Sequence, residues 1–259
     1  MKSFEGAGVV VTGAGNGIGR AIAARFARAG ARVIVNDLDA AAATTTAEEI
    51  GAVAVPGDAA SEAGVAALVA SARDRLGAID VFCANAGVMA GAGPETPEPV
   101  WARAWEINVM AHVRAARALL PAWLERGEGR FVVTASAAGL LTMLGSAPYS
   151  VTKHAALAHA EWLAATYAHR GLSVHCLCPQ GVRTRLLDDA GAAADLLLRK
   201  QALDPDDVAA ALWEGIAAGR FLILPHGAVH DYAVQRASDT DCWLAAMNRL
   251  QRRLETIEA

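Results

Sequence analysis

Features that mark nucleic-acid-binding or exported proteins are missing from this sequence. The chain has 23 Lys and Arg against 27 Asp and Glu, for a net charge of -4, and it contains no basic block. We therefore expect no nucleic-acid partner. Met1–Gly8 lacks the apolar segment of a secretion signal, so we expect a cytoplasmic protein.

Metal-binding spacings are missing as well. The sequence has four cysteines, and their spacing does not suit a metal ion, so we expect all four to be reduced and buried. They are Cys83, Cys176, Cys178 and Cys242. His226 and His230 are four residues apart, but without a third ligand we expect no bound metal.

No hydrophobic run suits a membrane span, although 54% of the residues are hydrophobic. The longest uncharged stretch, Phe131–Thr152, has 22 residues, which is long enough to cross a bilayer. Polar residues and glycines interrupt it, so we expect a strand that continues into a buried loop, and no membrane partner. The chain also lacks linkers and internal repeats, so we expect residues 1–259 to form one domain.

Short apolar runs, often β-branched, alternate with longer Ala-rich stretches along the chain. The runs are typical of buried parallel strands, and each stretch between them is long enough for a helix. The alternation predicts an α/β fold: a single doubly wound parallel sheet (Rossmann fold) of about seven strands, with helices on both faces. The expected strands are Gly8–Thr12, Ala31–Asn36, Ala52–Pro56, Ile79–Ala84, Arg130–Ala135, Ser173–Cys178 and Arg220–Leu224. The expected helices are Gly19–Ala29, Ala40–Ile50, Glu62–Leu76, Val100–Arg126, Tyr149–His169, Asp206–Ala218 and, at the C-terminus, about Asp239–Ile257.

A glycine-rich turn, Thr12-Gly13-Ala14-Gly15-Asn16-Gly17-Ile18-Gly19, follows the first expected strand and precedes a helix. Glycines let the backbone approach a pyrophosphate, and the helix presents its free N–H groups and positive dipole end to that anion. The context therefore predicts a dinucleotide site.

Asp37 ends the second expected strand, 18 residues beyond Gly19. A carboxylate at this spacing accepts hydrogen bonds from the hydroxyls of an adenosine ribose and repels a 2′-phosphate. Because no Arg or Lys lies in the turn before Gly19, we expect NAD rather than NADP.

Tyr149 and Lys153 are four residues apart in an expected helix, and Ser136 lies 13 residues before Tyr149. Residues four apart share one helix face. A cation next to a phenol favours the phenolate, and a tuned phenol serves as a general acid or base near neutral pH. Such a pair is common on exposed helices and does not by itself indicate a catalytic site. It becomes informative because the same chain contains the predicted dinucleotide turn.

Together these motifs resemble the short-chain dehydrogenase/reductase family over roughly Lys2–Leu224. Asp58 matches the acid that follows the third strand and meets the adenine amino group, and Asn85-Ala86-Gly87 matches a segment after the fourth strand. The residues that match the catalytic tetrad in order and spacing are Asn108, Ser136, Tyr149 and Lys153.

The resemblance implies hydride transfer between NAD(H) and a secondary alcohol or ketone. It assigns Tyr149 as the acid or base, and Lys153 as the cation that lowers the Tyr149 pKa and holds the nicotinamide ribose. Ser136 would bind the substrate oxygen, and Asn108 would hold a helix irregularity and a water that relays protons through Lys153. The residues expected to contact the cofactor are Gly13, Gly15, Asn16, Gly17, Ile18, Gly19, Asp37, Leu38, Asp58, Ala59, Asn85, Ala86, Gly87, Tyr149, Lys153, Val182 and Thr184.

Three departures from the family pattern stand out. Ala84 replaces an Asn, which removes one structural hydrogen bond. Gln180 replaces a Gly in Pro179–Thr184, which changes the path of that loop. A divergent extension over residues 225–259 replaces the usual ending and puts the usual tetramer interface in doubt.

The substrate pocket is expected to involve residues 88–95, 137–147 and 185–203, the last within a lid at 185–205. Residues 137–145 are almost entirely apolar, so we expect a neutral, hydrophobic alcohol or ketone. Arg183 and Arg185 are expected to be solvated lid residues; binding of a carboxylate or thioester tail is the alternative.

The Ala-rich helices expected at 100–126 and 149–169 suit subunit contacts, so we expect a homodimer or homotetramer. Two other functions stay open. One is an NADPH-dependent 3-oxoacyl or ketone reductase, which Asp37 disfavours. The other is a non-catalytic nucleotide-sensing scaffold, which the intact tetrad disfavours.

Overall fold

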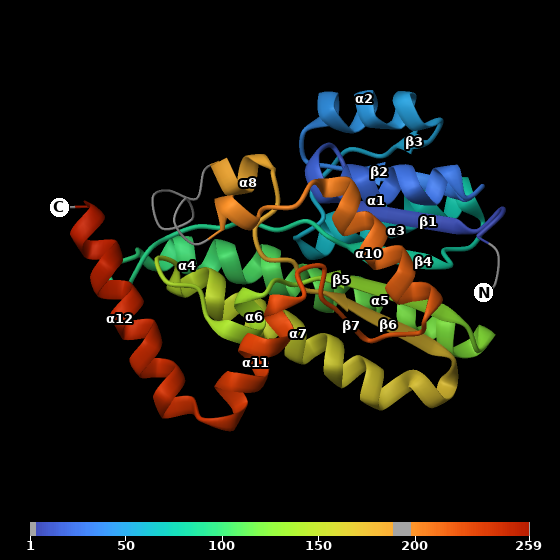
Figure 1. The fold of residues 1–259 in the computed structure, drawn as a ribbon. Helices are drawn as coiled ribbons and strands as arrows, with labels where there is room; N and C mark the ends of the chain where they lie inside the picture. Colours follow the sequence, from blue (N-terminus) through green and yellow to red (C-terminus); the bar gives the residue numbers. More distant parts are fainter. Residues whose placement is uncertain (1–3, 189–197, 259) are drawn as a thin grey trace.

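The computed structural model describes residues 4–188 and 198–258, and its centre is one parallel sheet (Figure 1). The strand order is β3-β2-β1-β4-β5-β6-β7, and every pairing is parallel. The strands are β1 (Gly8–Thr12), β2 (Arg32–Asn36), β3 (Val53–Ala54), β4 (Val81–Ala84), β5 (Gly129–Thr134), β6 (Leu172–Leu177) and β7 (Leu222–Ile223). The predicted doubly wound sheet is thus confirmed. Its order reverses between β1 and β4, and in such sheets ligands bind at the carboxyl ends of the strands beside that point.

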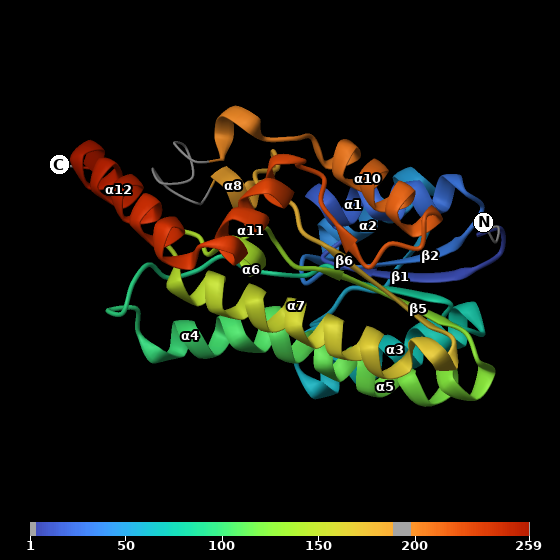
Figure 2. The ribbon, with the colours of Figure 1, turned by 60° about the horizontal axis from the view of Figure 1, so that its bottom comes forward.

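Helices cover both faces of the sheet (Figure 2). One face carries α1 (Gly17–Arg28), α2 (Ala40–Ile50) and α10 (Pro205–Ala217). The other carries α3 (Glu62–Leu76), α4 (Glu98–Trp105), α5 (Ala111–Arg126) and α7 (Ala147–Tyr167).

The core lies in two layers because side chains alternate across each strand. In the fully buried strand β1, Val9 and Val11 pack with Phe26 of α1 on one face. Val10 points to the other face and joins the layer that contains Phe82 and Phe131. This double burial explains why the strands read as continuous apolar runs.

The edge strands are shorter than expected. β3 and β7 each have two residues, whereas five were predicted for each region. Both lie at an edge of the sheet and pair with a neighbour on one side only, and Val53 of β3 is 41% exposed. A pattern of apolar residues does not define the end of such a strand.

The long helix expected at 100–126 is interrupted. Between α4 and α5 lies a π-helical turn, Glu106–Met110, so the chain runs continuously but with altered hydrogen bonding. The apolar stretch after β5 also contains a short helix that was not expected, α6 (Ala138–Leu141).

The C-terminal extension forms two helices where one was expected. α11 (Ala228–Ser238) follows directly after the Pro225–Gly227 break, and α12 (Thr240–Glu258) extends away from the body (Figure 1). α11 packs on α6, and Arg236 Nη1 donates a 2.7 Å hydrogen bond to the Leu140 carbonyl. Cys242 of α12 is exposed, so the expectation that all four cysteines are buried is wrong for this residue.

The short remaining helices are η2 (Ala168–Arg170), α8 (Arg185–Asp188) and η3 (Arg199–Gln201). In the part of the chain that the structure describes, no helix has both the length and the apolar character needed to cross a bilayer. The lid expected at 185–205 falls partly on residues 189–197, which lie outside the described residues.

Candidate active site

A cavity of about 720 Å³ lies at the carboxyl ends of the strands. It runs from the glycine turn after β1 to the C-terminal helix α12. All the residues predicted to contact the cofactor line it except Gly15, and so does the predicted tetrad except Asn108. The sequence motifs therefore converge on one space.

The glycine turn packs tightly against the segment after β4. A Cβ atom at Gly19 would lie 2.1 Å from the Gly13 carbonyl oxygen and 2.6 Å from Asn85 Nδ2, so a side chain does not fit there. Asn16 precedes α1 but does not cap it with its side chain. The N–H groups that begin α1 are thus oriented for an anion at the cavity wall.

The Asp37 carboxylate is held in place by the same turn. Asp37 Oδ2 accepts a 2.8 Å hydrogen bond from the Gly15 N–H, and Oδ1 accepts one of 3.1 Å from the Asp39 N–H. A Cβ at Gly15 would lie 2.8 Å from Asp37 Oδ2, so the glycine permits this close approach. The carboxylate is fixed while its side chain still lines the cavity.

Asp58 forms a similar anchored acid at the start of α3. Its oxygens accept hydrogen bonds from the N–H groups of Ala60 (2.8 Å) and Ser61 (3.1 Å). The Ser61 hydroxyl is the largest of the causes that lower the Asp58 pKa, and these backbone donors add to it. Asp58 is therefore held ionised at the cavity wall.

Two threonines support the loop at Asn85: Thr12, which the sequence analysis named only as the start of the glycine motif, and Thr134, which it missed. Thr12 Oγ1 accepts hydrogen bonds from the N–H groups of Asn85 and Ala86, both at 3.1 Å. Thr134 Oγ1 donates to Asn85 Oδ1 at 3.0 Å. Both threonines end strands that flank or neighbour β4, so a polar residue at the end of a buried apolar run was the available signal.

Asn108 is fully buried in the π-helical turn. Its amide pairs with the backbone of Val88: Nδ2 donates to the Val88 carbonyl and Oδ1 accepts from the Val88 N–H, both at 2.9 Å. Nδ2 also donates to Thr152 Oγ1 at 3.0 Å, a partner that the sequence did not reveal. Asn108 thus fixes the segment after Gly87 to helix α7, while the π turn frees the local backbone from regular helical bonding.

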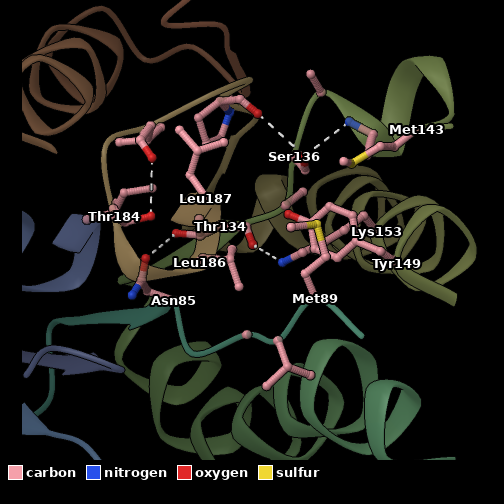
Figure 3. Close-up of a pocket in the computed structure, with 18 of the residues that line it drawn as sticks. Asn85, Met89, Thr134, Ser136, Met143, Tyr149, Lys153, Thr184, Leu186 and Leu187 are labelled. Carbon is pink, nitrogen blue, oxygen red and sulfur yellow. Dashed lines mark hydrogen bonds between the residues drawn. The ribbon is translucent and has the colours of Figure 1, made fainter. Parts of the chain in front are cut away.

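Lys153 is buried and points from α7 to the end of β5 (Figure 3). Its Nζ donates a 2.9 Å hydrogen bond to the Thr134 carbonyl and lies 5.6 Å from the centroid of the Tyr149 ring. Burial lowers the pKa of Lys153 to about 8.

Tyr149 is also buried, and Ser136 lies at the same end of the cavity (Figure 3). Burial raises the pKa of Tyr149, and a hydrogen bond with the Ser136 side chain opposes this increase. The direction is opposite to the decrease expected from Lys153, because the dominant effect is loss of solvent and the ammonium group is directed to the Thr134 carbonyl.

The other end of the cavity is apolar. Leu141, Met143 and Leu144 line it from the segment after Ser136, as expected for residues 137–147. Of the segment 88–95, Val88 and Met89 line it, and of 185–203 the described lining residues are Leu186, Leu187 and Leu198. A further part of the lining was not anticipated, because it comes from the C-terminal helices: Tyr232, Trp243, Ala246, Met247 and Leu250.

The loop after β6, in which Gln180 replaces the Gly of the family pattern, is held by hydrogen bonds with His226. The Gln180 N–H donates to His226 Nδ1 at 3.2 Å, and His226 Nε2 lies 3.2 Å from the Gln201 carbonyl oxygen. His226 therefore has a structural role in this loop. Gln180 Oε1 is buried and has no hydrogen-bond partner among the described residues. Because Gln180 lines the cavity, this oxygen could accept a hydrogen bond from an N–H group of a bound ligand.

Neither Arg183 nor Arg185 lines the main cavity. Arg183 Nη1 lies 2.9 Å from Asp204 Oδ1 in an exposed ion pair. Residues 4–188 and 198–258 contain no cluster of three or more His, Cys, Asp or Glu side chains arranged to hold a metal ion.

Comparison with known proteins decides the family. The sequence profile of the family described as short chain dehydrogenase matches residues 7–195. The chain belongs to the short chain dehydrogenase family. Proteins similar to this chain include dehydrogenases, and the chain is an oxidoreductase.

Individual members of the short chain dehydrogenase family resemble the chain over most of its length. The 1-deoxy-11-beta-hydroxypentalenate dehydrogenase of Streptomyces exfoliatus is 39% identical over 83% of this chain and 81% of its own. The 17-beta-hydroxysteroid dehydrogenase 13 of Rattus norvegicus is 29% identical over 96% of this chain and 85% of its own. The solved structure of a family member from Burkholderia phymatum in complex with NAD has a TM-score of 0.86 and 31% identity, covering 93% of this chain and 96% of that one.

Proposed function

We propose that this protein is an NAD-dependent dehydrogenase that interconverts a neutral, hydrophobic secondary alcohol and the corresponding ketone, with Tyr149 as the acid or base. One observation carries the proposal: Ser136, Tyr149 and Lys153 converge in a cavity whose other residues include the glycine turn and an apolar wall. A proton-handling group, a dinucleotide cradle and a hydrophobic binding space are what this reaction requires.

The residues at the glycine turn fit NAD. The backbone at Gly19 leaves no room for a side chain, and α1 directs its first N–H groups to the cavity, as a pyrophosphate requires. Asp37 and Asp58 are anchored acids that would hold the adenosine ribose and the adenine. The unpaired Gln180 Oε1 would accept a hydrogen bond from the nicotinamide carboxamide, next to Val182 and Thr184. When bound, NAD supplies the hydride acceptor.

The chain itself orients the substrate and moves its proton. The Ser136 hydroxyl would hydrogen-bond the substrate oxygen and stabilise the charge that develops on it. Tyr149 would take the hydroxyl proton during oxidation and return it during reduction. Burial raises the Tyr149 pKa in the protein alone, so this pKa has to fall before Tyr149 can act as a base. Positive charge close to the phenol during turnover would lower it.

The substrate is proposed to be bulky. Leucines, methionines and helix α12 line the apolar part of the cavity, and the acidic and basic side chains that line the cavity among the described residues are Asp37, Asp58, Arg103 and Lys153. A relative named for a 17-beta-hydroxysteroid supports an alcohol on a ring system. The small number of polar groups would select the position of one hydroxyl rather than a charged tail.

A ladder of secondary alcohols tests the reaction. Cyclohexanol, the bicyclic borneol and a 17β-hydroxysteroid would be incubated with NAD, and NADH formation followed by absorbance. We expect the larger alcohols to have higher kcat/KM, and Tyr149→Phe to lose activity by about 100-fold or more. Full activity of Tyr149→Phe contradicts the assigned role. The absence of turnover with the whole ladder, in both directions, favours a nucleotide-sensing scaffold.

Cofactor choice is tested separately by fluorescence titration with NADH and NADPH. We expect NADH to bind more tightly because a fixed carboxylate at Asp37 repels a 2′-phosphate. Tighter binding of NADPH would instead support the reductase alternative.

We also propose a single domain that forms a homodimer or homotetramer through the outer faces of α4 and α7. Trp105 of α4 is 41% exposed, and Val151 and Trp162 of α7 are 48% and 56% exposed. Exposed apolar side chains of this size are typical of an interface. Light scattering coupled to size-exclusion chromatography measures the mass, and a monomer at micromolar concentration contradicts this proposal.

A further inference from the structure

Two aromatic side chains of the C-terminal helices line the cavity and carry polar atoms that the mechanism above does not use. Tyr232 of α11 and Trp243 of α12 form a pair whose ring centroids lie 6.2 Å apart, with 43° between the ring planes. Tyr232 is 36% exposed, and Trp243 is partly buried. Within residues 4–188 and 198–258, neither the Tyr232 hydroxyl nor the Trp243 indole N–H has a hydrogen-bond partner. Both groups are therefore available to a ligand.

The position of Trp243 is set by a small buried cluster. Its indole packs against Ala137, Leu141 and Val229. Ala137 and Leu141 also line the cavity, and Ala137 directly follows Ser136, the residue proposed to bind the reacting oxygen. The aromatic pair thus lies beside the wall that begins at Ser136, on the part of the cavity proposed to hold the substrate.

The position of Tyr232 is set by Arg236, which lies four residues later on α11. Residues four apart share one helix face. The Arg236 guanidinium donates a 2.7 Å hydrogen bond to the Leu140 carbonyl, which holds this face of α11 against the segment after Ser136. Tyr232 lies one turn before that anchor, so its phenol is held on the same side as Trp243 rather than on a freely moving helix.

The chemistry of the pair favours an uncharged oxygen. A phenol both donates and accepts a hydrogen bond, whereas an indole only donates one. The described residues of α11 and α12 that line the cavity carry no charge, and those one turn from Trp243, Ala246 and Met247, are apolar. Two donors with apolar neighbours match an acceptor such as a carbonyl or hydroxyl oxygen, and they offer no counter-charge for an ionised group.

We infer that Tyr232 and Trp243 bind a second oxygen of the substrate, remote from the hydroxyl that is oxidised. The inference rests on the proposed function and narrows its substrate class to a bulky ring alcohol that carries a further carbonyl or hydroxyl, that is, a hydroxyketone or a diol. The two residues determine specificity and take no part in the proton or hydride transfer. Because the second oxygen does not change during the reaction, its hydrogen bonds should act on KM more than on kcat.

Matched pairs of alcohols test the inference. One pair is a 17β-hydroxysteroid with and without a ketone on the ring farthest from its hydroxyl, and the other is a bicyclic alcohol with and without a ketone on its second ring. The wild type should have a higher kcat/KM for the ketone-bearing member of at least one pair. Tyr232→Phe keeps the ring and removes the hydroxyl, so it should lower that preference by about five-fold, the effect of one neutral hydrogen bond.

The ratio within a pair separates the hydrogen bond from packing. A change in packing affects both members of a pair, so a merely structural role for Tyr232 would change both values of kcat/KM and leave their ratio as it is. Trp243→Phe removes the indole N–H and should lower the ratio in the same direction. Tyr167→Phe is the matched control, because Tyr167 packs against Trp162 on α7 and does not line the cavity. An unchanged ratio in Tyr232→Phe, or no preference in the wild type, overturns the inference.

A binding measurement separates failure of this inference from failure of the proposed function. Equilibrium dialysis of the protein with NADH and a steroid that has the same ketone but no hydroxyl requires no turnover. We expect Kd to be about five-fold higher in Tyr232→Phe than in the wild type. That difference without oxidation of any alcohol leaves the inference standing and removes the proposed function. Equal binding by the two proteins, or no binding to the wild type, overturns the inference even if alcohols are oxidised.

Discussion

Lys153 Nζ donates a 2.9 Å hydrogen bond to the main-chain oxygen of Thr134, at the carboxyl end of β5. The side chain of the same threonine donates to Asn85 Oδ1 at 3.0 Å. One strand end therefore links the ammonium group beside Tyr149 to the loop that borders the glycine turn. The proton transfer proposed at the substrate end and the cofactor binding proposed at the other end therefore both depend on Thr134.

Lys153→Met is expected to remove activity and increase stability. The pKa of Lys153 is about 8 in the folded protein against an ordinary value of 10.5, so the unfolded chain holds the proton more tightly. The free energy of unfolding of the wild type should therefore rise as the pH increases from 8 to 10.5, and its loss below pH 8 is about 3 kcal/mol. Urea unfolding at pH 7 and pH 10 should show this rise in the wild type and its absence in the variant. Equal pH dependence in both proteins contradicts the buried, depressed lysine.

Asp37→Ala is expected to weaken NADH binding by roughly ten- to a hundred-fold, the effect of losing hydrogen bonds to a charged group. NADPH binding should improve relative to NADH, because the repulsion of a 2′-phosphate is removed. Fluorescence titration measures both dissociation constants.

Asp39→Ala is the matched control for this change. Asp39 caps α2 by accepting a 3.1 Å hydrogen bond from the Ala42 N–H, and it does not line the cavity. Its loss should lower the free energy of unfolding by about 1 kcal/mol and leave NADH affinity as it is. Equal NADH affinity in Asp37→Ala and Asp39→Ala would show that Asp37 does not hold the ribose.

The sheet could be predicted because strands that are buried on both faces appear in the sequence as continuous apolar runs. The residues of β1 are buried throughout, and the run Gly8–Thr12 matches the strand at both ends. The helices that were not predicted lack such a signal. α6 has four residues and no side-chain cap, and α11 begins at the break that the sequence suggested would end regular structure. Their positions are set by packing against each other, a contact between residues 96 apart in the chain at Arg236 and Leu140.

The candidate site shows the same division between residues that the sequence predicts and residues that it does not. Residues within short motifs, such as Asp37 or Lys153, carry their chemistry in local spacing and reach the cavity as predicted. Thr152 acts through a hydrogen bond to Asn108, 44 residues away in the chain, so nothing near Thr152 in sequence distinguishes it from ordinary polar residues. The raised pKa of Tyr149 depends on how completely the fold buries the phenol, which spacing to Lys153 does not report.

Thr142→Gly is expected to raise stability and change activity. Thr142 has φ 67° and ψ 126°, and it is the only non-glycine residue with a positive φ in the described part of the chain. This conformation costs a β-branched residue roughly 1–3 kcal/mol. Ser150 Oγ holds the next residue in place by bonding both the N–H (2.8 Å) and the carbonyl (3.1 Å) of Met143.

Relief of the strain should increase the free energy of unfolding by about 1 kcal/mol, after the greater freedom of glycine in the unfolded chain is counted. Because Thr142 lines the cavity, kcat/KM for borneol should fall in the same variant. Thr142→Val keeps the β-branched strain, so it should gain no stability. A Thr142→Gly protein that is less stable than the wild type contradicts the strained backbone.

Met247→Trp is expected to narrow the apolar end of the cavity. Met247 lies on the face of α12 that lines the cavity together with Trp243 and Leu250. A larger side chain there should lower kcat/KM for borneol and the 17β-hydroxysteroid by about ten-fold or more, because overpacking costs roughly 1–3 kcal/mol. Cyclohexanol should be affected little, since it leaves the outer part of the cavity free. Leu244→Trp adds the same side chain at a position that is 57% exposed on the same helix, and should change none of these values. If Met247→Trp and Leu244→Trp have the same selectivity as the wild type, α12 is not a wall of the substrate site, and the preference for bulky alcohols has to arise from the segment between Ser136 and Tyr149 alone.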